Sequence, residues 1–147
     1  MENRKKLIPI IESVLFCGRQ GLALTGHRDG GRVLDNDDVS IDANEGNFRE
    51  LLKYRAQYDD HIHHVLSNAK NNALYTSWKI QNKIIEIRNK LILENLVKKI
   101  NSSLYFSVLV DETTDISCME QMTLCIRCID STSSIIEELF LQFVPLM

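Results

Sequence analysis

The stretch YFSVLVDETTD, Tyr105 to Asp115, decides the fold of this chain. Its first part, Tyr105 to Val110, is almost entirely aromatic or aliphatic, which is typical of a strand buried on both faces of a sheet. The polar residues from Asp111 onward predict a loop at the end of that strand. Asp111 therefore stands where active sites often carry an acid, although an aspartate after a strand also commonly caps a turn by accepting backbone N–H groups.

Two more strands follow at hairpin distance. Their β-branched and aliphatic residues lie in Glu120 to Asp130 and in Ile135 to Val144, and the polar turn Ser131 to Ser134 joins them. Sequential strands with short connections pair antiparallel. The sequence thus predicts a three-stranded antiparallel sheet over residues 104–147.

Residues 1–103 predict a helical region instead. Apolar residues recur at helical spacing in Lys5 to Arg19, in Asn47 to about Ser67, and in Ser77 to about Ile100. The segment at about 22–47 is rich in glycine and acidic residues and predicts a long loop. The expected fold class is therefore α+β, with the helical region ahead of the sheet.

The helix expected from Ser77 carries two apolar stripes, so it needs neighbours on two sides. The stripes lie roughly 140° apart at about 100° per residue, and they hold Ile80, Ile84, Ile87 and Leu91 in one and Ile85, Ile92, Leu96 and Ile100 in the other. A third line holds Lys79, Lys83 and Lys90. These lysines are candidates for weak contact with DNA phosphates, while a line of charge on a long helix is more often its solvated side.

Composition excludes several classes of protein. The 147 residues are 44% hydrophobic and carry a net charge of -3, so the chain can bury a core but has no overall basic field for nucleic acid. It contains neither an apolar run of about 18 residues nor a secretory cleavage site. We expect an intracellular protein without a membrane partner and without a small-molecule substrate.

The four cysteines predict neither a disulfide framework nor a zinc site. Cys125 and Cys128 form a C-x-x-C, but on a strand an offset of three places the two sulfurs on opposite faces, where they cannot share a metal. His61 and His64 fit one face of a helix, yet no further ligand lies at a telling spacing. We expect these cysteines and histidines to be structural.

Six segments carry a resemblance to a known family. They are CGRQGLALTGHRD (17–29), GNFRELLKYRAQYD (46–59), YTSWKIQNKIIEI (75–87), FSVLVDETTDIS (106–117), EQMTLCIRCID (120–130) and EELFLQFVPL (137–146). In this order they resemble the uncharacterised domain of hAT-type transposases and their domesticated relatives, the MYM-type zinc-finger-like and protein-kinase-inhibitor-repressor-like proteins. No single segment carries the resemblance alone; it is specific because all six occur in the family's order over nearly the whole chain.

The resemblance implies a helical region that leads into a ribonuclease-H-like core, in which three acids hold two Mg²⁺ ions that cut and join DNA. Clustered carboxylates suit this chemistry because hard cations take oxygen ligands, and paired cations activate the attacking oxygen and stabilise the leaving one. By its place at the end of the first strand, Asp111 matches the first of these acids. Asp115 is a second choice, better suited to ordering the loop.

The chain also departs from that pattern. It holds only the first three strands, without the segments that carry the other two acids, the upstream zinc finger and the downstream dimerisation region. We therefore expect a fragment of a domesticated or decayed transposase, nuclear by resemblance, that uses no cofactor as it stands and is not an enzyme alone. The alternatives are an interaction module that pairs with itself or another chain through its incomplete sheet, or a DNA-associated regulatory protein that uses the helix 77–100.

Overall fold

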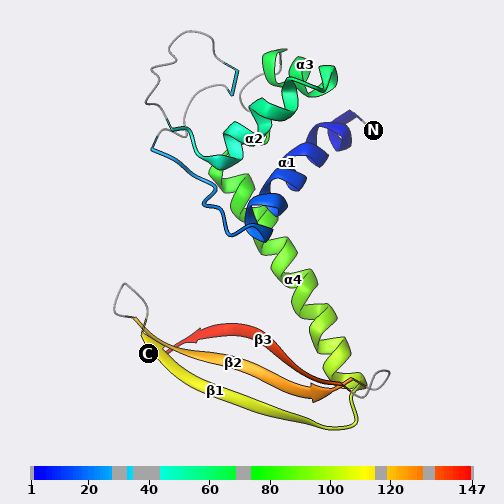
Figure 1. Ribbon diagram of the computed structural model, residues 1–147, viewed down its shortest axis with the longest axis vertical. Coiled ribbons are helices and arrows are strands. Elements are labelled where there is room, and N and C mark those ends of the chain that lie inside the picture. Colours follow the sequence, from blue (N-terminus) through cyan, green and yellow to red (C-terminus); the bar gives the residue numbers. More distant parts are fainter. Residues whose placement is uncertain are drawn as a thin grey trace. The chain divides into compact units, whose positions relative to one another are not determined.

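The computed structural model describes residues 2–27, 33–34, 44–68, 74–114, 119–130 and 135–146. Over these residues the chain forms helices α1 to α4 and then strands β1 to β3 (Figure 1). The α+β class predicted from the sequence is therefore confirmed. Contacts within the chain group it into two compact units, Met1–Glu86 and Ile87–Met147. The division falls inside α4, whose last turn packs against the sheet through Ile100.

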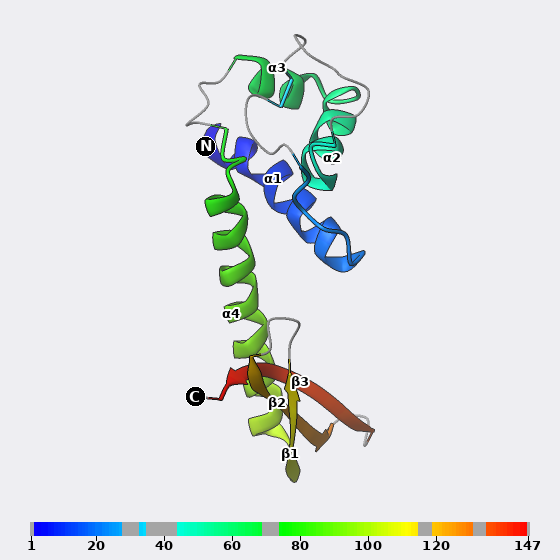
Figure 2. The same ribbon diagram turned by 90° about the vertical axis from the view of Figure 1, so that its left-hand side faces the viewer.

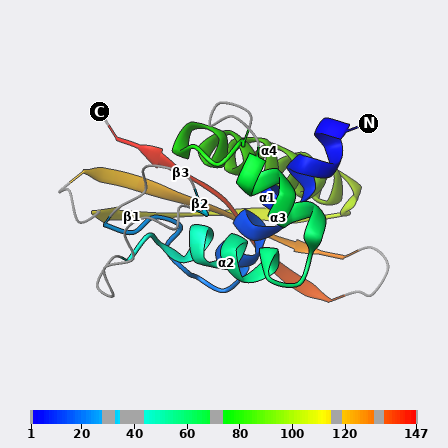
Figure 3. The same cartoon turned by 90° about the horizontal axis from the view of Figure 1, so that it is seen from above.

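The first unit is built from α1 (Glu2–Arg19), α2 (Asn47–Ala56), α3 (Asp60–Asn68) and the first turns of α4 (Trp78–Ser102). Seen from above, α1, α2 and α3 lie side by side (Figure 3). Their inward faces share one apolar cluster, which consists of Ile10, Val14, Val33, Phe48, Leu52, Ala56, Ile62, Leu66 and Leu74. In α1, α2 and α3 the helical periodicity of apolar residues is thus the periodicity of burial. The expectation that α4 has neighbours along two apolar stripes is wrong for the described residues, since Ile85, Ile87, Leu91 and Ile92 are exposed.

Local signals fix the ends of these helices. Helix α1 ends at Arg19. Gly21, two residues later, has a φ of 64° in the left-handed region, and the N–H of Leu22 donates to the carbonyl of Cys17 at 2.9 Å. Ser77 lies one residue before α4, and its carbonyl accepts the N–H groups of Ile80 and Gln81 at 3.0 Å. Both positions are those predicted from the sequence.

The prediction of one helix from Asn47 to Ser67 is wrong. The segment forms α2 and α3, which are separated at residues 57–59. The Asp59 carboxylate accepts the backbone N–H groups of His61 at 2.9 Å and Ile62 at 3.1 Å, which satisfies the free donors of a new helix start. Asp59 therefore starts a second helix inside a segment whose apolar residues follow one continuous helical spacing.

The second unit holds the rest of α4 and an antiparallel sheet of order β1-β2-β3. Its strands are β1 (Phe106–Thr114), β2 (Glu120–Ile129) and β3 (Ile136–Pro145), and the pairing of β2 with β3 shifts register between Leu124 and Cys125. The last turns of α4 lie beside the sheet in both side views (Figures 1 and 2). There Ile100 packs with Ile126 and Cys128, and Leu139 and Leu141 adjoin them.

Two expectations for the first strand are wrong. Residues 111–114, predicted as a loop, continue β1, because they pair with Thr123 to Glu120 of β2. The strand is also not buried on both faces, since Phe106, Val108 and Val110 are each more than half exposed. A run of β-branched residues predicts a strand, but it does not say whether anything covers it.

Two parts of the prediction fall outside the described residues: most of the loop at about 22–47, and the turn Ser131 to Ser134.

The C-x-x-C is described, and its cysteines lie on opposite faces of β2. Cys128 is buried beside Ile100, while Cys125 is paired across the sheet with Leu109 and Phe140. Both are free thiols. Among the helices described, none has the length and apolarity to cross a bilayer.

Candidate functional site

Asp111 lies within β1, as its sixth residue of nine, and not at a strand end. The register places it opposite Thr123 of β2, which is in turn opposite Phe143 of β3. Its side chain is exposed. Asp111 therefore projects from the open face of the sheet, beside a hydroxyl and an aromatic ring.

No second acid joins Asp111 within the described part of the chain. Glu112 follows it directly and so points to the other face, where its register partner is Met122. No three His, Cys, Asp or Glu side chains among the described residues are grouped so as to hold a metal ion. Asp115, the second candidate, falls outside those residues. The carboxylate cluster that two Mg²⁺ ions need is thus not formed by the described acids.

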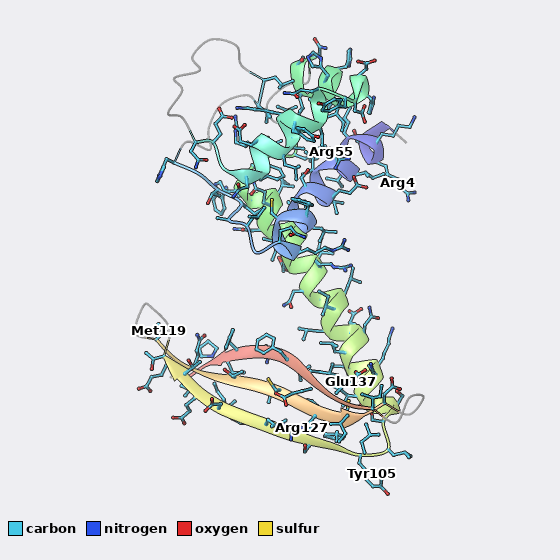
Figure 4. All side chains as sticks on the ribbon, viewed as in Figure 1. Arg4, Arg55, Tyr105, Met119, Arg127 and Glu137 are labelled. Carbon is cyan, nitrogen blue, oxygen red and sulfur yellow. The ribbon has the colours of Figure 1, made fainter. Side chains whose placement is uncertain are left out.

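Acids elsewhere in the sheet form ion pairs instead. Glu138 of β3 pairs with Arg127 of β2 at 2.8 Å, and Glu137 pairs with Lys99 of α4 at 2.5 Å (Figure 4). The hydrogen bond to Glu137 raises the pKa of Lys99 above its ordinary value, and a small loss of hydration opposes it. This pair holds one flank of α4 to β3.

The three lysines of the proposed basic line have different surroundings. The ammonium of Lys79 lies over the ring of Trp78, 5.6 Å from its centroid, and Lys83 donates to both carboxylate oxygens of Glu86 at 2.9 Å. Both belong to the first unit. Lys90 belongs to the second unit and is exposed. Lys83 and Glu86 are three residues apart on a helix, a spacing from which their ion pair can be predicted from the sequence.

A groove of about 470 Å³ between α1 and α2 was not predicted from the sequence. Leu15, Phe16 and Leu51 supply its apolar lining. At its border Arg55 (labelled in Figure 4) donates to Glu12 at 2.8 Å. These two residues are 43 positions apart, so only the packing of the helices brings them together.

A polar network fixes the start of α2. The Glu45 carboxylate accepts from Lys53 at 2.6 Å and from Arg49 at 3.2 Å, and Lys53 also reaches Glu50 at 3.0 Å. Partial burial raises the pKa of Glu45, but the hydrogen bonds and the positive charges of Lys53 and Arg49 outweigh it, so the pKa falls below the ordinary value. This network is structural, because its charges are mutually satisfied.

Comparisons with known proteins identify relatives. Over 149 residues the chain is 25% identical to the 52 kDa repressor of the inhibitor of the protein kinase of Homo sapiens, and over 145 residues it is 27% identical to the protein of that name in Mus musculus. Each alignment covers 98% of this chain but only 18% of the relative. No solved structure matches.

A family model matches residues 1–147 throughout, and the resemblance drawn from the six segments is confirmed. The described sheet agrees with the family's description as RNase-like. This chain belongs to the family DUF4371, the ZMYM1/FAM200, RNase-like domain.

Proposed function

We propose that this RNase-like domain does not cut nucleic acid by itself, and that it serves a transposase-derived regulatory protein by binding other macromolecules. The observation that carries the proposal is the position of Asp111. Its carboxylate is the match to an ancestral metal ligand, yet its neighbours in the register are Thr123 and, one strand further, Phe143. A single carboxylate supplies too few oxygen ligands for two-metal hydrolysis.

The relatives support the regulatory part of the proposal. Their printed name describes a repressor of the inhibitor of the protein kinase, and not a nuclease. The chain spans 18% of their length, so the domain contributes to a larger protein in those cases. We propose the same kind of non-enzymatic role for this chain, in the nucleus, as part of a domesticated or decayed hAT-type transposase.

A nuclease assay tests the catalytic part. The purified chain, incubated with labelled single- and double-stranded DNA and RNA in Mg²⁺ or Mn²⁺, is expected to release no product above a protein-free control. Asp111→Asn is the matched variant, because it keeps the size and loses the charge. Cleavage by the natural chain that Asp111→Asn abolishes would contradict the proposal, while cleavage that both retain indicates a contaminating nuclease.

DNA association through α4 is a second candidate function, and the exposure of Lys90 favours it. Lys83 contributes less, because Glu86 neutralises it. Lys79→Glu together with Lys90→Glu is expected to remove binding that falls steeply with salt. Lys98→Glu changes the same charge on another side of the same helix and is the control. Absence of binding at low salt would eliminate this candidate.

A further inference from the structure

We draw no further inference here: the strongest candidate, the apolar groove between α1 and α2, carries nothing, because its border holds Glu12 as well as Arg19 and Arg55, so that charge selects no partner, and nothing in the described residues shows what covers it.

Discussion

Gly26 and Gly46 approach each other where the chain returns to begin α2. A Cβ on Gly46 would stand 2.5 Å from the backbone nitrogen of Gly26, and the φ of Gly46 is 89°. Both constraints exclude a larger side chain. Beside them the N–H of His27 donates to the carbonyl of Asn44 at 3.0 Å, which ties the two segments together. The absence of side chains at the two glycines therefore lets the segment around Gly26 pack directly against the start of α2.

Replacement of Gly46 by alanine is expected to lower the free energy of unfolding by more than about 1 kcal/mol, since the new Cβ meets backbone that cannot move aside. Gly18→Ala is the matched control. Gly18 lies in α1 with no atom within 4 Å of a built Cβ, so alanine is expected to be neutral or to stabilise by up to about 1 kcal/mol. Urea denaturation measures both, and equal effects would contradict the role given to Gly46.

Glu45 is expected to make the stability of the first unit depend on pH. Its pKa in the folded chain is lowered, because Lys53 and Arg49 outweigh the effect of burial. A lowered pKa contributes stability that is present above the ordinary glutamate pKa of about 4.3 and is lost as pH falls through the folded value. The difference in unfolding free energy between wild type and Glu45→Gln should therefore shrink below about pH 4.3. A difference that stays constant between neutral and acid pH would contradict this assignment.

The elements show which parts of the fold can be predicted from one sequence. The strands β2 and β3 and the start of α4 lie within a residue or two of their predicted places, because alternation and capping are local signals. The exposure of β1 was not predictable, since its apolar run is the same whether or not another element covers it. Asp111 was predicted at the end of the first strand but lies within β1, and its isolation depends on the cross-strand register, which no local pattern reports.

The break between α2 and α3 gives a prediction at this scale. Asp59 accepts two backbone N–H groups at the start of α3, and its replacement by alanine is expected to cost about 1 kcal/mol of stability. Asp60→Ala is the neighbouring control, because its carboxylate is not the acceptor in those two bonds. Amide exchange at His61 and Ile62 should rise in Asp59→Ala only. Equal exchange in the two variants would show that the cap does not divide the helices.

At the scale of the whole molecule, the described residues form two apolar clusters that share no residue. One is centred on Phe48 and Leu52 in the first unit, and the other on Ile126 and Cys128 in the second. The second unit holds the strand that carries Asp111. The helical unit holds the α1–α2 groove, a surface at which a partner could bind.

Separate clusters predict separate opening of the two units. Leu52→Ala removes a fully buried side chain and is expected to cost about 2–5 kcal/mol in the first unit. Hydrogen exchange should then accelerate in α1 and α2 and much less in β2. Ile126→Ala is the reciprocal variant, with the opposite pattern expected. Uniform acceleration throughout the chain in either variant would mean that the units open as one.

Binding of Mg²⁺ at Asp111 is the most direct test of the central claim, that this RNase-like domain lacks a working metal site of its own. Nuclear magnetic resonance of the ¹⁵N-labelled chain during a Mg²⁺ titration reports every β1 amide separately. The account predicts small, unsaturated shifts that are the same in wild type and Asp111→Asn. A saturable shift around Asp111 that Asp111→Asn abolishes would contradict the account, because it would show that Asp111 binds Mg²⁺.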